Sequence, residues 1–132
     1  MSIKGFHHVA IKAEDFDRAY SFYTELLGLR RVNAWNEPAG RAVMLATEDD
    51  SRIELFEGGK KAEHPDNYGI IHMAFRTDDP DKYINAVRAA GYEVTMVPTD
   101  VCPPSDTNES FNARIAFCKG PCDELIEFFH MK

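Results

Sequence analysis

Two histidines and two glutamates stand out because each pair recurs in a similar local sequence. His8 and His72 lie 64 positions apart in apolar segments, and Glu54 and Glu127 each follow an isoleucine near the end of a chain half. Two imidazoles and two carboxylates suit one divalent metal ion, such as Zn, Ni, Co or Mn. Four protein ligands would also leave positions open for water or substrate, as catalysis requires.

The repeated positions belong to a longer internal repeat. Residues 5–11 align with residues 69–75, and Asp15 and Asp17 align with Asp79 and Asp81. Residues 52–56 align with residues 125–129 once a longer loop is allowed in the second half. Matches at both ends of both halves predict two copies of one structural unit.

Each copy is predicted to have the order strand, helix, strand, strand, strand. Apolar positions recur at helical spacing after Asp15 and again after Asp79, where Pro80 occupies the first helical position. Gly28 and Gly91 are predicted to end the two helices. The fold class is therefore α+β, with modules at 1–60 and 69–132. The expected strands are 6–12, 30–36, 41–47 and 51–57, then 70–76, 92–98, 113–118 and 124–130, with a linker at 58–68 and a polar loop, a possible lid, at 99–112.

Alternation along the strands assigns each candidate to a face. Apolar neighbours must pack beneath the helices, which leaves His8, Glu54, His72 and Glu127 on the opposite face. Taken singly, each would be an ordinary strand histidine or a surface glutamate, but the repeat favours one shared metal site. His7 faces the helices in this register, which makes it a core histidine or a residue that supports the ligands; a shift of one residue would exchange it with His8.

The pattern resembles the vicinal oxygen chelate superfamily, which includes glyoxalase I, fosfomycin-resistance proteins and extradiol dioxygenases. The resemblance covers nearly the whole chain, with matching residues at 8–11, 15–19, 22–29, 53–55, 70–75 and from 116 to 127. It implies a single domain over 1–132 in which tandem βαβββ modules form a cupped mixed sheet around a metal, with the helices outside. It also implies a small substrate whose neighbouring oxygens chelate that metal.

The ligand set favours one branch of this family. Glyoxalase I-like lyases carry His, Glu, His and Glu, as here, whereas methylmalonyl-CoA epimerase has glutamine in place of Glu54. The implied function is proton transfer beside a carbonyl through a metal-chelated enediolate, with Glu127 as proton carrier and Glu54 as its pseudosymmetric partner. The alternatives are a metal-free ligand-binding or antibiotic-resistance protein of the bleomycin or fosfomycin type, and an extradiol-type dioxygenase.

Other residues are candidates for binding the substrate. Lys12 stands where bacterial glyoxalase I has an arginine that helps bind glutathione, and Gly58 stands where that family has an asparagine. Because lysine does not replace arginine at a site that binds a carboxylate with two hydrogen bonds, these differences argue against a glutathione adduct as the substrate. Further residues that could line the cup are Trp35, Asn33, Met44, Phe56, Arg114 and Phe129.

Composition narrows the partners. The 132 residues are 44% hydrophobic and 28% charged, with a net charge of −7, which argues against nucleic acid or an anionic membrane as a partner. We expect a cytoplasmic protein because no signal peptide or spanning segment is evident and the three cysteines are an odd number, typical of reduced thiols. The family resemblance implies a homodimer, although either one chain or two could complete the metal site.

Overall fold

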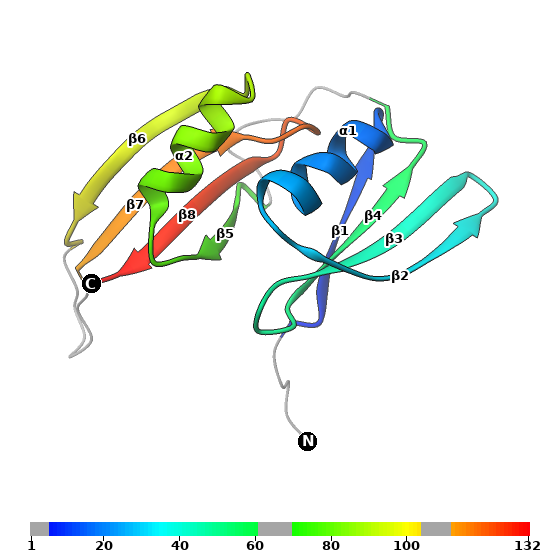
Figure 1. Ribbon diagram of the computed structural model, residues 1–132, viewed down its shortest axis with the longest axis horizontal. Coiled ribbons are helices and arrows are strands. Elements are labelled where there is room, and N and C mark those ends of the chain that lie inside the picture. Colours follow the sequence, from blue (N-terminus) through cyan, green and yellow to red (C-terminus); the bar gives the residue numbers. More distant parts are fainter. Residues whose placement is uncertain (1–5, 61–69, 104–111) are drawn as a thin grey trace. The chain divides into compact units, whose positions relative to one another are not determined.

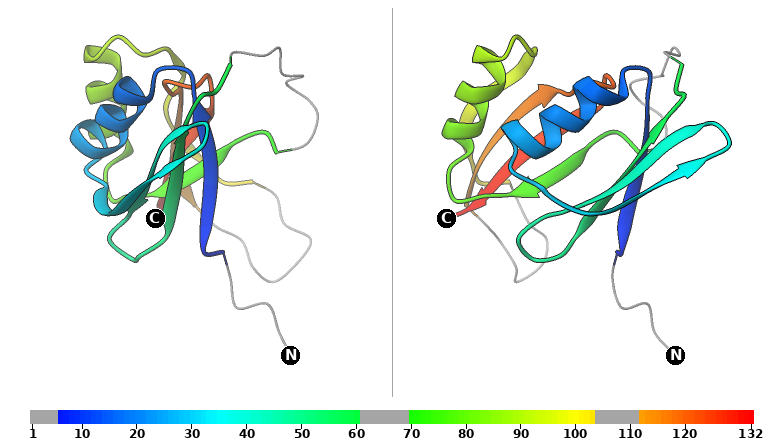
Figure 2. Two further views of the ribbon diagram at one scale, coloured as in Figure 1. Left: turned by 90° about the vertical axis from the view of Figure 1, so that its right-hand side faces the viewer. Right: turned by 45° about the vertical axis from the view of Figure 1, so that its right-hand side comes forward.

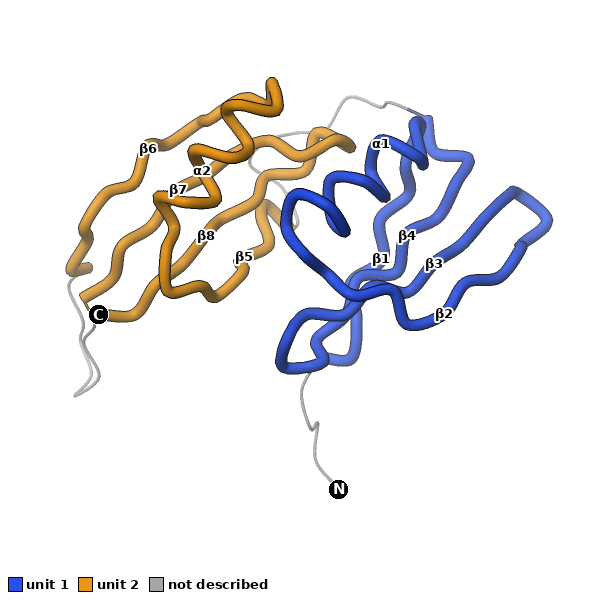
Figure 3. The backbone as a smooth tube through the Cα atoms, in the orientation of Figure 1, with its two compact units in different colours: residues 1–63 blue, residues 64–132 orange. Residues whose placement is uncertain are grey.

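Each half of the chain begins with a strand and a helix and then adds three strands. The structure is a computed structural model that describes residues 6–60, 70–103 and 112–132. The chain divides into two compact units, residues 1–63 and 64–132 (Figure 3). The first unit contains β1 (His8–Ala13), α1 (Phe16–Ser21), β2 (Arg30–Glu37), β3 (Gly40–Ala46) and β4 (Arg52–Glu57). The second contains β5 (Met73–Arg76), α2 (Pro80–Ala89), β6 (Val94–Val101), β7 (Ala113–Lys119) and β8 (Leu125–Met131).

Each unit has one four-stranded mixed sheet. The strand orders are β1-β4-β3-β2 and β5-β8-β7-β6, so the two sheets have the same topology (Figure 1). In each sheet the first strand runs parallel to the last, and the other neighbours are antiparallel. The predicted α+β fold class is confirmed.

The helix of the first unit begins as predicted but changes its winding. The side chain of Asp15 caps α1 by accepting a hydrogen bond from the backbone N–H of Arg18 at 3.1 Å. A π-helical segment, Phe22–Leu26, then replaces the single α-helix expected up to Gly28. Its wider turn carries the adjacent residues Phe22 and Tyr23, both of which are buried.

The helix of the second unit follows the predicted start. Asp79 caps α2 by accepting from the backbone N–H of Lys82 at 3.0 Å, and Pro80 occupies the first turn. Ile84 and Val87 are fully buried against the sheet, and the Tyr83 ring stacks on Phe128 of β8 at 5.4 Å between centroids. Figure 2 gives two further views of the helix and sheet of each unit.

Two predicted boundaries differ from the structure in ways that matter for the site. β5 begins at Met73, so His72 lies just before the strand rather than within it. β6 continues to Val101 because Thr99, Asp100 and Val101 pair with β7, and the predicted loop 99–112 therefore starts only at Cys102. The rest of that loop, 104–111, and most of the predicted linker lie outside the described residues.

None of the helices in the described part of the chain combines the length and the apolar composition that crossing a bilayer requires.

Candidate metal and substrate site

The first unit brings one histidine and one glutamate together. β1 runs parallel to β4 with Ala10 opposite Glu54, so His8 and Glu54 project from the same face of the sheet. The Nε2 atom of His8 lies 3.5 Å from Oε1 of Glu54. The imidazole and carboxylate form the first half-site, which offers one nitrogen and one oxygen donor.

The second unit contains the equivalent pair in a less exposed setting. Nε2 of His72 lies 3.2 Å from Oε1 of Glu127, and Glu127 is a buried charged residue of the described core. Burial raises the pKa of Glu127 above the ordinary glutamate value, and the neighbouring His72 opposes that shift. The Phe117 ring stands edge-on to His72 at 5.4 Å and supplies an apolar wall. His72 and Glu127 form the second half-site.

The donor chemistry of these half-sites fits a divalent metal. Imidazole nitrogen and carboxylate oxygen are donors that Zn, Ni, Co and Mn accept, and a cation would favour the ionised form of the buried Glu127 carboxyl. Each half-site alone has two donors, and among the described residues no group of three or more His, Cys, Asp or Glu side chains is placed to hold a metal ion. The joint four-ligand site therefore stays a prediction.

Two predicted substrate-binding residues share the face of the first half-site. The register that aligns His8, Ala10 and Lys12 with alternate residues of β4 places Lys12 on this face, opposite Phe56. Trp35 joins them across β3: its ring stands edge-on to Phe56 at 6.4 Å, and its Nε1–H donates to Glu37 Oε1 at 3.0 Å.

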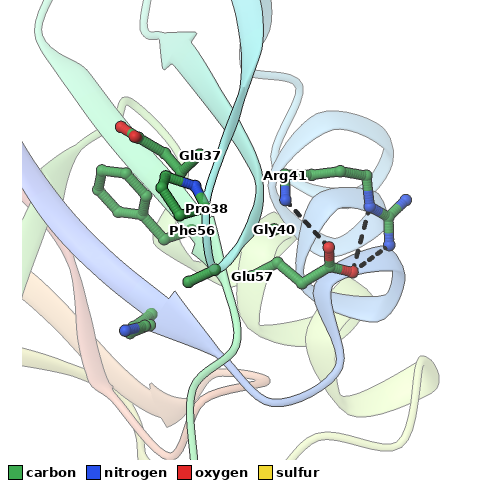
Figure 4. A pocket seen from close by; sticks show the side chains of 8 residues that line it. Glu37, Pro38, Gly40, Arg41, Phe56 and Glu57 are labelled. Carbon is green, nitrogen blue, oxygen red and sulfur yellow. Dashed lines mark hydrogen bonds and ion pairs between the residues drawn. The ribbon is translucent and has the colours of Figure 1, made fainter.

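A pocket of about 380 Å³ opens beside this face, at the end of the sheet (Figure 4). Phe56 lies beside Pro38 on one side of the β2–β3 hairpin, and the ion pair of Arg41 with Glu57 lies on the other (Figure 4). Gly40 has a φ of 137°, and a Cβ there would lie 2.6 Å from Oε1 of Glu57, so this turn requires glycine. The pocket is lined by Lys12, Glu37, Pro38, Ala39, Gly40, Arg41, Phe56 and Glu57.

The two predicted substrate-binding residues of the second unit lie on opposite faces. Phe129 alternates with Phe128 along β8 and shares the face of Glu127. Arg114 pairs with His130 on the other face, where its Nε donates to Asp81 of α2 at 2.6 Å and its Nη1 to Asp100 at 3.2 Å. The guanidinium holds the pKa of Asp81 below the usual range. Arg114 therefore ties the helix to the sheet, on the face away from the half-site.

The first unit contains a counterpart of this contact at Arg41, a residue not among the predicted site residues. Arg41 of β3 donates from Nη1 to Asp17 of α1 at 2.8 Å and from Nη2 to Glu57 at 2.7 Å, and its guanidinium lies over the Phe16 ring. The alignment of Asp17 with Asp81 was the available signal, since both aspartates accept hydrogen bonds from an arginine of the third strand.

The placement of His7 corrects one sequence-based alternative. The core assignment is wrong, because β1 begins only at His8 and His7 is exposed. His7 instead contacts the first half-site, with its Nδ1 at 2.9 Å from Nδ1 of His8.

The cysteines lie outside both half-sites. Cys118 is buried on β7, and burial raises the pKa of its thiol to about 12. That thiol stays protonated at neutral pH and is a poor nucleophile.

Comparison with known proteins identifies the family. The family model of the Glyoxalase/Bleomycin resistance protein/Dioxygenase superfamily matches residues 5–128. The chain is 33% identical over 132 residues to lactoylglutathione lyase of Haemophilus influenzae, covering 95% of this chain and 91% of the relative.

Solved structures agree on the fold. A glyoxylase/bleomycin resistance protein/dioxygenase domain from Frankia superposes with a TM-score of 0.80 at 20% identity, covering 99% of this chain and 100% of that one. A mutant of the fosfomycin resistance protein FosX from Listeria monocytogenes, in complex with Mn(II) and a dihydroxypropylphosphonic acid, gives 0.70 at 17% identity, covering 96% and 92%. Since the family model spans nearly all of the chain, this protein belongs to the Glyoxalase/Bleomycin resistance protein/Dioxygenase superfamily.

Proposed function

We propose that the protein is a metal-dependent lyase or isomerase of the glyoxalase I type, which moves a proton beside a carbonyl in a small substrate. One observation carries the proposal: each unit pairs a histidine at the start of its first strand with a glutamate of its last strand, at 3.5 Å and 3.2 Å, in sheets of the same topology. Family membership and the lactoylglutathione lyase relative support the same reaction class.

In this proposal His8, Glu54, His72 and Glu127 hold one Zn, Ni, Co or Mn ion together. The second pair of donors comes from the other unit of the same chain or from a partner copy in a homodimer. A bound metal supplies Lewis acidity, which polarises the substrate carbonyl and lowers the barrier to removing a proton from the adjacent carbon.

Glu127 is the proposed proton carrier. In the metal-free chain, burial raises the pKa of Glu127 above the ordinary glutamate value, so a Glu127 carboxylate that leaves the metal accepts a proton more readily than an exposed glutamate would. It would accept the proton from the carbon beside the carbonyl and return it to the neighbouring carbon. Because Phe117 and His72 wall it off on one side, bulk water has limited access to the proton in transit.

The pocket of the first unit is proposed to hold the remainder of the substrate. Phe56, which Trp35 contacts edge-on, offers an apolar surface, and the Lys12 ammonium offers a positive charge. The two acidic residues of this pocket already accept hydrogen bonds from other side chains, Glu57 from Arg41 and Glu37 from Trp35. These hydrogen bonds leave the Lys12 ammonium available to a substrate. A small carbonyl compound with an apolar body and an anionic end fits these groups.

The decisive experiment is metal analysis followed by reconstitution. We expect the purified protein to bind about one divalent ion per four-ligand site, to lose activity after chelation, and to regain it with Zn, Ni, Co or Mn. The assay would screen thiol adducts of 2-oxoaldehydes, including the glutathione adduct. Tight binding of an antibiotic without bound metal would instead support the binding protein, and iron with oxygen consumption would support the dioxygenase.

A further inference from the structure

The two ring nitrogens of His8 face different partners. Nε2 points to the Glu54 carboxylate at 3.5 Å, and Nδ1 lies 2.9 Å from Nδ1 of His7. The two rings stand nearly perpendicular, with an interplanar angle of 86° and centroids 5.2 Å apart. This contact lies at the start of β1, where no other polar side chain of the described residues is seen to bond with His8 Nδ1.

Two ring nitrogens at this distance share a single hydrogen, so one donates and the other accepts. A metal-binding nitrogen must present its lone pair, and the nitrogen that faces Glu54 is Nε2. His8 must then carry its hydrogen on Nδ1. The acceptor in reach is Nδ1 of His7, which in turn keeps its own hydrogen on Nε2.

We propose that His7 is a positioning residue that fixes the tautomer and ring orientation of His8 for metal binding. The inference rests on the proposed function, since it concerns a ligand of the proposed metal. Ligating histidines usually donate their second ring N–H to a carboxylate, a carbonyl or water. Here a neighbouring imidazole takes that part.

In the second half-site the position aligned with His7 holds no histidine. The aligned position is Ile71, an exposed apolar residue that can neither donate nor accept through its side chain. His72 is instead constrained by the Phe117 ring and the buried Glu127 carboxyl. The first half-site, which is more exposed, therefore depends on a hydrogen bond for an orientation that packing supplies in the second.

The test compares Zn²⁺ affinity in variants of the full chain, measured by competition with a chromogenic chelator. His7→Phe keeps a ring but removes the acceptor, and we expect a loss of about 10–100-fold in affinity. His7→Asn places an amide oxygen near the position of Nδ1, and we expect it to restore most of the affinity. His130→Phe makes the same exchange on β8, outside both half-sites, and should bind Zn²⁺ like the unmodified protein.

Nitrogen-15 NMR of the histidine rings supplies a readout independent of activity. In the Zn²⁺-loaded protein, His8 should carry its hydrogen on Nδ1. In the metal-free His7→Phe variant, the His8 ring should lose the tautomer preference that it shows in the metal-free unmodified protein. Equal Zn²⁺ affinity of His7→Phe and the unmodified protein, or metal on Nδ1, would overturn the proposal. Absence of Zn²⁺ binding by the unmodified protein would overturn the metal site itself, and the metal-free ring spectra would still decide whether His7 orients His8.

Discussion

The two half-sites use the same pair of residue types in different surroundings. The Glu54 side chain is 17% exposed and its histidine partner contacts His7, whereas the Glu127 side chain is 10% exposed and its partner stands against Phe117. The same strand register places the histidine and the glutamate together in both units. The two carboxylates differ in exposure because different residues lie opposite them on the neighbouring strand, Met44 opposite Glu54 and Phe117 opposite Glu127. A duplicated backbone thus presents equivalent donors, while the residue across the sheet sets how strongly each carboxylate is desolvated.

A second duplicated contact lies on the helix-covered faces. Arg41 and Arg114 each hold the aspartate in the first turn of their unit's helix, but the third partner is Glu57 of β4 in one case and Asp100 of β6 in the other. The shared part of the contact joins helix to sheet. The part that differs shows that the carboxylate completing the cluster can come from either neighbouring strand.

The largest expected effect comes from removing one carboxylate at a time. Glu127→Gln should lower kcat by about 10²–10⁴-fold because the buried base is lost, and Glu54→Gln should lower it less. Steady-state kinetics with the substrate found by screening measures both, with metal content as the control. Equal turnover of metal-loaded Glu127→Gln and the unmodified protein would reject Glu127 as the proton carrier.

The same substitution has a predicted effect on stability in the metal-free protein. Because the folded-state pKa of Glu127 is raised, the ionised carboxylate disfavours the fold as pH rises through that pKa. Glu127→Gln should therefore be the more stable protein at pH 7. Urea unfolding at several pH values checks this, and the gain should vanish below the ordinary glutamate pKa; a gain that persists at low pH would contradict the assignment.

The cores of the two units allow a matched test of packing. Phe128 and Leu55 occupy equivalent positions on β8 and β4, and both are buried. Phe128→Ala should cost about 3–5 kcal/mol and Leu55→Ala about 2–5 kcal/mol in the free energy of unfolding. Amide hydrogen exchange should rise most in the unit that carries the substitution. Met131→Ala, at an exposed position, is the control and should change little.

The smallest effects should come from the two arginines. Arg114 lowers the pKa of Asp81 and Arg41 lowers that of Glu57, so each contact stabilises the fold above the ordinary carboxyl pKa and loses this effect as pH falls through the lowered value. Arg114→Met and Arg41→Met should lower the urea midpoint modestly at pH 7, and the difference should narrow below about pH 4. A difference independent of pH would indicate lost packing instead.

Much of the site followed from local sequence. The repeat predicted that His8 and His72 lie in corresponding places, and strand alternation predicted the faces of the two histidines and two glutamates. In the structure Lys12 and Trp35 share the face of the first half-site, and Phe129 shares the face of Glu127. Arg114 could not be assigned in this way, because a charged residue on a strand satisfies the alternation pattern on either face when an acidic partner is available. Asp81 and Asp100 provide that partner on the helix side.

What the chain determined by itself is the order of elements, the duplication and the caps of the two helices, because periodicity, Asp15, Asp79 and Pro80 act over a few neighbouring residues. Tertiary structure alone decided the burial of Glu127 beside Phe117 and the two arginine contacts. Each of these depends on which side chain meets which across a strand pair or between a helix and a sheet, a distance in space that spacing along the chain does not encode.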